Sequence, residues 1–214
     1  MIAGVSRLLP LVRGADADDA ERRPVLDAAL AAFLDFGIKR TSMAEVAKRS
    51  GLSLATVYRR FAKKPDLVQA VGLREVRRFI AEVDGRIDRS ASAEEQIVEM
   101  FVAYSQGLRK HRLLARLIAT EPELVLPLLT VRGAPVLELG TDYLTEFLER
   151  LQTEGKLPAY AVRPVAEVVA RVSLSMALTP ETAIPLHDDT AARAFARAHI
   201  VVALHVPQRK SRRR

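Results

Sequence analysis

Apolar residues recur three and four positions apart along most of this chain, and this spacing places them on one face of a helix. No segment alternates apolar and polar residues as a half-buried strand would. Helices are expected over about 65–86, 97–108 and 113–118, from 122, from 134 to about 155, over 163–178 and over 190–206. A connection rich in Pro, Thr and Asp separates the last two. The predicted fold class is therefore all-α.

The stretch 42–61 contains two short helical patterns joined at a turn, and it is the most informative part of the sequence. Ser42 can cap the first helix, with Glu45 three residues later completing a capping box. Gly51 can adopt the positive φ that a sharp turn between helices commonly needs. Ser53 can then cap the second helix. This order of caps and turn predicts a helix-turn-helix motif.

The second helix of the motif should bury its apolar positions and expose a face suited to a DNA groove. A reading helix needs donors for phosphates and a few side chains for base edges or thymine methyl groups. We expect phosphate contacts from Thr41, Ser53, Tyr58 and Lys64, base contacts from Leu54, Thr56 and Arg59, and further DNA contacts from Ser42 and Lys63. The alternative is an ordinary pair of packed helices with solvated arginines.

The motif and its flanks share one pattern of residues over 22–71, formed by Leu26, Ala28, Ala29, Phe33, Gly37, Thr41, Ser42, Ala47, Gly51, Thr56, Tyr58, Phe61, Lys64 and Leu67. With these residues the segment resembles the DNA-binding domain of the TetR family of bacterial repressors, which makes the DNA-binding interpretation the stronger one. This resemblance implies a three-helix head on a helical ligand-binding and dimerisation body. It also implies a homodimer that binds a palindromic operator and is released by a small molecule. Pro24, Leu54 and Pro65 depart from the family's usual pattern.

Charge is unevenly distributed along the 214 residues, whose formal net charge is +7. Residues 20–75 carry eleven Lys and Arg against six Asp and Glu, a net +5, whereas residues 76–205 are close to neutral. A cationic head fits a phosphate-binding surface. The terminal residues 206–214 carry five further Lys and Arg and no acidic residue. We favour a solvated terminus for them over a DNA-contacting extension.

These patterns give expected boundaries: a flexible arm over 1–18, the head over 19–79 with its motif at 42–61, a helical body over 80–206 and a basic disordered tail over 207–214. The chain lacks cysteine, which excludes disulfides and thiol catalysis. No signal-peptide core and no apolar run of the roughly 20 residues that span a bilayer are present. We expect a cytoplasmic protein with no membrane partner.

The effector and dimer sites are expectations from the family resemblance. A largely apolar effector would lie within the body, against Met100, Phe101, Tyr104, Leu117, Tyr143 and Phe147, with charged residues such as Arg116, Glu121, Arg132 and Asp142 available to fix a polar end. Most of the apolar residues are equally consistent with plain core. The last two long helices would pair across a two-fold axis through Ala166, Val169, Ala170, Ser173, Ala177, Phe195, His199 and Val202. The alternative for these residues is burial within one subunit.

An enzymatic function is not favoured. The four histidines form no HExxH pair, and the scattered glycines form no phosphate-cradling loop. We therefore expect no catalytic residue, no metal and no cofactor. The prediction is a sequence-specific regulator of transcription, most simply a ligand-released repressor, with a ligand-independent DNA-binding activator or architectural protein as the alternative.

Overall fold

The computed structural model describes residues 20–179 and 181–205, and within those residues the chain is helical without strands. The predicted all-α class is confirmed. The predicted arm at 1–18 and tail at 207–214 lie outside the described residues. The chain divides into two compact units, the first formed by residues up to Phe79 together with His111–Val136, and the second by Ile80–Lys110 with the residues from Leu137 onward.

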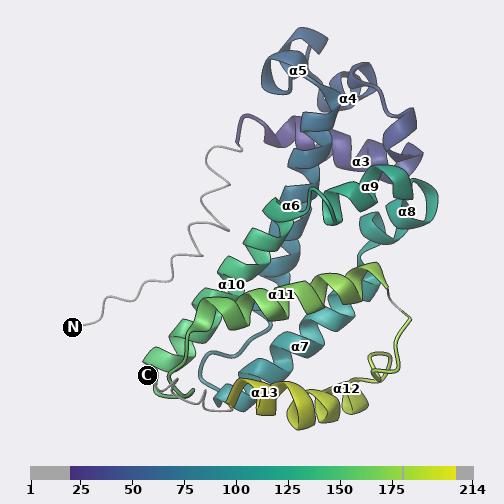
Figure 1. The fold of residues 1–214 in the computed structure, drawn as a ribbon. Helices are drawn as coiled ribbons and strands as arrows, with labels where there is room; N and C mark the ends of the chain where they lie inside the picture. Colours follow the sequence, from purple (N-terminus) through teal and green to yellow (C-terminus); the bar gives the residue numbers. More distant parts are fainter. Residues whose placement is uncertain (1–19, 180, 206–214) are drawn as a thin grey trace. The chain divides into compact units, whose positions relative to one another are not determined.

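Unit 1 contains the predicted head. It is built from α3 (Arg23–Arg40), α4 (Met43–Ser50), α5 (Leu54–Arg60), most of α6 (Lys64–Gly85), α8 (Arg112–Thr120) and α9 (Pro122–Leu129), as Figure 1 shows. α3 begins with Pro24 in its first turn, where the missing amide would have no helical partner. One buried cluster joins these helices, including Leu26, Phe33, Val46, Val57, Leu67, Leu113, Leu117 and Val125. The head therefore shares a single core with α8 and α9.

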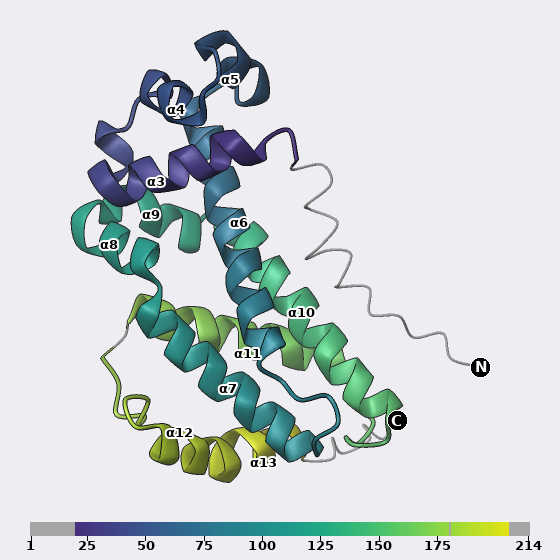
Figure 2. The ribbon, with the colours of Figure 1, turned by 180° about the vertical axis from the view of Figure 1, so that it is seen from behind.

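Unit 2 consists of the end of α6 with α7 (Ala93–Lys110), most of α10 (Ala134–Thr153), α11 (Val162–Leu178), α12 (Asp189–Phe195), the π-helical turn η1 (Ala196–Val201) and α13 (Val202–His205), seen from behind in Figure 2. α7 lies against α12 and η1, and the rings of Phe101 and Phe195 approach to 5.8 Å between centroids. The buried side chains of unit 2 include Ile97, Val98, Phe147, Leu148 and Leu151. Within the described residues no single helix is long and apolar enough to cross a membrane, although the bent pair α9 and α10 would pass on length and composition.

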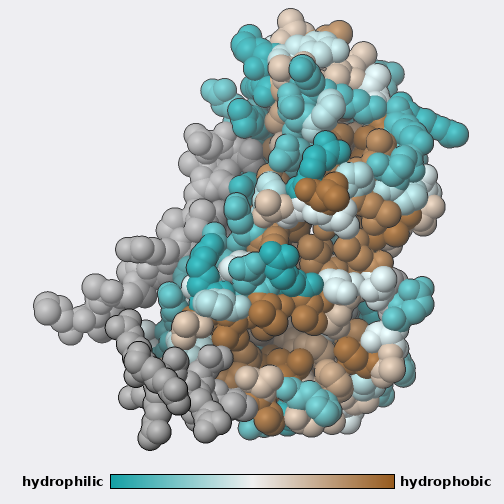
Figure 3. All heavy atoms as spheres, in the orientation of Figure 1, coloured by the Kyte–Doolittle hydropathy of each residue, from teal (hydrophilic) through white to brown (hydrophobic). Residues whose placement is uncertain are grey.

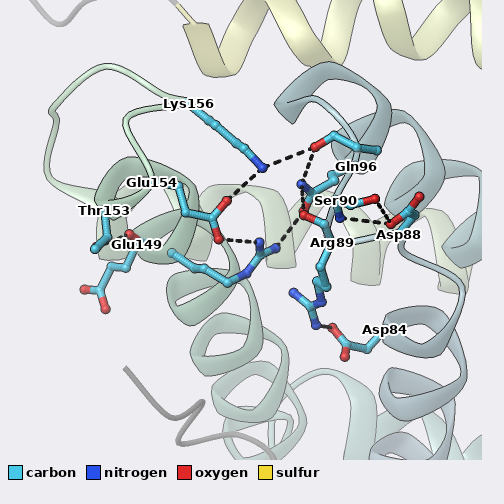
Figure 4. Close-up of polar contacts among 11 residues, drawn as sticks. Asp84, Asp88, Arg89, Ser90, Gln96, Glu149, Thr153, Glu154 and Lys156 are labelled. Atoms are coloured by element: carbon cyan, nitrogen blue, oxygen red, sulfur yellow. Dashed lines mark hydrogen bonds and ion pairs between the residues drawn. The ribbon is translucent and has the colours of Figure 1, made fainter. Parts of the chain in front are cut away.

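A buried polar clamp fixes one end of unit 2 (Figure 4). The side-chain amide of Gln96 donates to the carbonyls of Arg89 (3.2 Å) and Ala91 (2.8 Å), and its oxygen accepts from Arg150 Nη2 at 2.9 Å. Lys156 Nζ donates to the same Ala91 carbonyl at 3.2 Å. The loop that leads from α6 into α7 is thereby tied to the C-terminal end of α10.

Two features differ from the expected organisation. The segment 111–136, expected in the body, belongs to unit 1 together with the residues expected in the head. The helix expected over 190–206 is interrupted at Ala196–Val201, where the backbone changes from α to π geometry. The other helices lie close to their expected positions, and Gly155 ends α10 with the positive φ (+69°) of a C-terminal cap.

Candidate DNA-binding surface

The helix-turn-helix motif has the predicted caps. The hydroxyl of Ser42 accepts from Glu45 N, and that of Ser53 accepts from Thr56 N, each at 3.1 Å. Gly51 takes φ +70° and ψ +18°, and its amide returns to the carbonyls that end α4. The carboxylate of Glu45 accepts from Arg49 Nε at 2.7 Å, instead of completing a capping box. These local bonds set the angle at which α5 leaves α4.

The second helix of the motif, α5, buries one face and exposes the other. Val57 and Phe61 are buried in the unit 1 core. Leu54, Tyr58 and Arg59 are exposed on this seven-residue helix. The exposed leucine and tyrosine leave apolar surface in water, which is typical of a surface that binds a partner. This face offers an apolar group, a phenol and a guanidinium together, which suits thymine methyl groups, phosphates and base edges respectively.

The structure gives Thr41 and Lys64 other partners. Thr41 is only 2 % exposed and its hydroxyl donates to the carbonyl of Gly37 at 2.7 Å, so we remove its side chain from the expected phosphate donors. Lys64 Nζ donates to the carbonyl of Lys39 at 3.2 Å, and burial lowers its pKa. Both residues therefore fasten the C-terminal end of α3. Ser42, Ser53 and Lys63 remain exposed, whereas Thr56 is half-buried with its hydroxyl 2.9 Å from that of Ser53.

Arg49 belongs to the scaffold of this surface. Its guanidinium pairs with Glu45 and with Asp35 at 2.7 Å each, which raises its pKa, and lies 4.9 Å from the ring centroid of Phe36. The arginine joins α4 to α3 and is committed to these contacts. Lys48, Arg59 and Lys63 are among the exposed basic residues of the head.

Sequence comparison decides the family. The family profile described as bacterial regulatory proteins, tetR family, matches residues 25–71, and that of the bacterial tetracyclin repressor C-terminal domain matches residues 90–199, half of the chain by itself. The chain belongs to the TetR family. It is a DNA-binding transcriptional regulator of the helix-turn-helix type, as the resemblance of residues 22–71 implied.

Relatives of this TetR-family regulator agree in sequence and fold. An HTH-type transcriptional regulator of Mycobacterium tuberculosis is 26% identical over 151 residues, covering 71% of this chain and 77% of the relative. The repressor AlkX from Dietzia superposes with a TM-score of 0.66 at 24% identity, covering 86% of this chain and 98% of AlkX. QsdR, a repressor from R. erythropolis, gives 0.63 at 21% identity, with 89% and 98% covered. These two structures support the fold alone.

The expected effector-site residues divide between the units of this TetR-family chain. Leu117 is part of the unit 1 core, whereas Met100, Phe101, Tyr104, Tyr143 and Phe147 lie in unit 2. Burial raises the pKa of both tyrosines, and each hydroxyl has a partner: Tyr104 donates to the carbonyl of Ser173, and Tyr143 donates to Asp84 at 3.0 Å.

Several charged residues expected at the polar end of an effector have structural partners instead. Arg163 pairs with Asp142 at 2.8 Å, and Arg116 donates to the carbonyl of Asp35 at 3.1 Å. Arg132 is exposed on the turn after α9, and Glu121 accepts backbone amides of α3. Among the residues that the structure describes, no group of three His, Cys, Asp or Glu side chains could hold a metal ion.

The expected dimer residues also separate by exposure. Ala166 and Ala170 are buried within unit 2, where Ala170 Cβ would lie 3.7 Å from a Cβ built at Gly140, so these two alanines face the chain's own α10. Val169, Ser173, Ala177 and Phe195 are half-buried, and His199 and Val202 are exposed. Val168 and Val172, which the sequence analysis does not name, are 62% and 55% exposed on α11. Their four-residue spacing was the available signal, since it places them on one helical face.

Proposed function

We propose that this regulator is a homodimeric repressor that binds a palindromic operator through α5 and is released by a small-molecule effector. The proposal rests on two exposed surfaces of the chain. One is the face of α5 formed by Leu54, Tyr58 and Arg59, and the other is the face of α11 formed by Val168 and Val172. A single α5 reads only one half-site. A palindrome requires two reading helices roughly 34 Å apart, and a two-fold dimer supplies them.

The dimer is supported by apolar side chains that the single chain leaves in water. Val168 and Val172 lie one turn apart on α11, and Val202 lies exposed on α13. Figure 3 shows hydrophobic residues gathered on the side of unit 2 from which α11 is seen in Figure 1. Such a face is typical of helix pairing between subunits. We place the contact there in preference to the buried alanines of α11.

The operator contacts divide into specifying and positioning groups. We assign Arg59, with Leu54, to base edges and thymine methyl groups, and Lys63, with Ser53 and Tyr58, to phosphates. Replacement of Arg59 by alanine should cost about 1–3 kcal/mol at one operator position and relax the preference there. Replacement of Lys63 by alanine should weaken every sequence equally and reduce the salt slope by about 1. Equal weakening of all sequences by Arg59→Ala would contradict the assignment.

We assign the effector to unit 2, where Met100 and the aromatic residues named above are the candidates for a mostly apolar wall. Phe147 and Tyr143 lie side by side on α10 with ring centroids 6.3 Å apart. The carboxylate of Asp142 pairs with Arg163, and the hydroxyls of Tyr104 and Tyr143 also have partners within unit 2. An apolar effector therefore fits better than a multiply charged one.

The test is fluorescence anisotropy with the DNA upstream of the regulator's own gene, against shuffled DNA of equal composition, over a series of salt concentrations. Tight and salt-steep binding to the native DNA alone would support operator reading. A compound library screened on that complex would then seek release, and operator and effector must weaken one another by the same factor at equilibrium. Specific binding that no compound weakens would favour the ligand-independent activator or architectural protein.

A further inference from the structure

The last turn of α3 is opened at Gly37, and this opening makes a small anion site from backbone amides. Gly37 has φ +81° and ψ +170°, far from helical values. Ile38 N and Lys39 N therefore leave the hydrogen-bond ladder of α3 and point to a common acceptor. That acceptor is the carboxylate of Glu121, whose two oxygens receive them at 2.5 Å and 2.8 Å respectively.

The site is built for a carboxylate. Glu121 is only 6% exposed, and a buried negative charge is tolerated where charge-assisted hydrogen bonds replace water. A glutamine of the same shape would turn an NH2 group toward one of the two donors. Gly37 is required as well, because a Cβ there would lie 3.0–3.1 Å from the carboxylate atoms of Glu121 and because the positive φ disfavours side chains.

The position of Glu121 in the chain gives this contact a functional consequence. Glu121 lies at the junction of α8 and α9, in the segment 111–136 that enters unit 1 from α7 and leaves it through α10. On the other side of the contact, the end of α3 leads directly into the Ser42 cap of α4. Thr41 and Lys64 add hydrogen bonds to the carbonyls of Gly37 and Lys39. The Glu121 carboxylate thus joins the segment 111–136, which lies between α7 and α10 in the chain, to the end of α3, where the helix-turn-helix motif begins.

We propose that Glu121 is a positioning residue for operator recognition. It holds the end of α3, and therefore α4 and α5, in the orientation that reads the operator. In this regulator it is also a buried polar contact through which a displacement of α7 or α10 reaches the motif; this second step rests on the effector release proposed above. Glu121 is buried and bonded to backbone amides of α3, so its effect falls on the specific complex more than on attraction to phosphates.

The experiment compares Glu121→Gln with two matched variants of the full-length protein. Glu123→Gln removes an exposed carboxylate two residues away, which pairs with Lys39 on the surface. Leu117→Ala makes a cavity in the core of unit 1, one turn before Glu121, and leaves the hydrogen bonds of Glu121 in place. It therefore shows how much a loss of stability alone weakens operator binding. The readouts are hydrogen exchange of the Ile38 and Lys39 amides and anisotropy with operator and shuffled DNA.

Glu121→Gln should accelerate exchange of the two amides at least tenfold and weaken operator binding about 10- to 100-fold, with shuffled DNA bound as before. Glu123→Gln should change neither by more than about twofold. If Glu121→Gln does not fold, Glu121→Asp replaces it, because it keeps the charge and withdraws the oxygens by one methylene. Unchanged operator affinity, or a loss no larger than that of Leu117→Ala at equal stability, would overturn the proposal. Failure of the wild type to prefer its operator would instead count against the proposed function, and the exchange data would still test Glu121.

Discussion

Replacing Val172 by aspartate gives the sharpest test of the proposed dimer, because the side chain is exposed in the single chain and would be buried in the pair. Val172 is 55% exposed on α11. Complete burial of a valine stabilises by about 1.5–3 kcal/mol, so covering its exposed part contributes about 1 kcal/mol. A two-fold interface contains the residue twice. The apolar loss is therefore about 2 kcal/mol per dimer.

The introduced carboxylates add a larger cost, since an ion buried without a partner is penalised by several kcal/mol after relaxation. A combined loss of at least about 4 kcal/mol corresponds to a dissociation constant raised about 1,000-fold. Sedimentation velocity at micromolar concentration should then show a monomer, and operator binding should weaken because the two heads are no longer linked.

Val131 provides the matched control. It is 87% exposed on the turn between α9 and α10 of unit 1, so Val131→Asp makes the same chemical change outside the proposed interface. This control should sediment as the wild type does. A Val172→Asp protein that remains dimeric with an unchanged dissociation constant would refute the assignment of α11 to the interface.

Three further predictions concern the head and the body. Ser53→Ala removes the cap of α5 and should destabilise unit 1 by about 1 kcal/mol, measured by urea unfolding, with a parallel loss of operator affinity. Gln96→Leu should cost about 3 kcal/mol in thermal unfolding, because it removes the donor to the carbonyl of Arg89, one of two donors to the carbonyl of Ala91 and one acceptor of the Arg150 guanidinium. Gln69→Leu on the exposed face of α6 should stay within about 0.5 kcal/mol. Burial raises the pKa of Tyr104 and Tyr143 above the ordinary tyrosine value of 10. Their contribution to stability is therefore present below pH 10 and is lost as pH rises above it. Each Tyr→Phe change should reduce the alkaline slope of the unfolding free energy by up to about 1.4 kcal/mol per pH unit.

The motif could be predicted from the sequence because its determinants are local. The caps at Ser42 and Ser53 bond to amides three residues away, and Gly51 needs only its own backbone freedom. The boundaries of α6 and α10 could be predicted similarly, because the helical spacing of apolar residues continues along each helix, and for α10 it stops near Gly155.

Contacts between distant parts of the chain could not be predicted in this way. Glu121 and Ile38 are 83 positions apart, and the sequence offers the carboxylate no visible partner, so the sequence alone suggests a contact with the polar end of an effector instead. α11 shows a second limit. The sequence predicts that its small residues pack against a second subunit, yet Ala166 and Ala170 are buried within unit 2 while Val172 is exposed. Periodicity identifies both apolar faces of such a helix but does not say which one the subunit itself covers.

α6 is where these local and long-range contacts meet, since it runs through both units. At its unit 2 end Asp84 accepts from Tyr143 and pairs with Arg89 at 2.5 Å, and at its unit 1 end Lys64 bonds to the carbonyl of Lys39. A hydrogen bond of this kind contributes about 1 kcal/mol, and coupling between effector and operator sites typically amounts to about 1–3 kcal/mol. If the proposed effector takes the hydroxyl of Tyr143 from Asp84 and the whole of this energy is coupled to the operator site, operator affinity should change about fivefold.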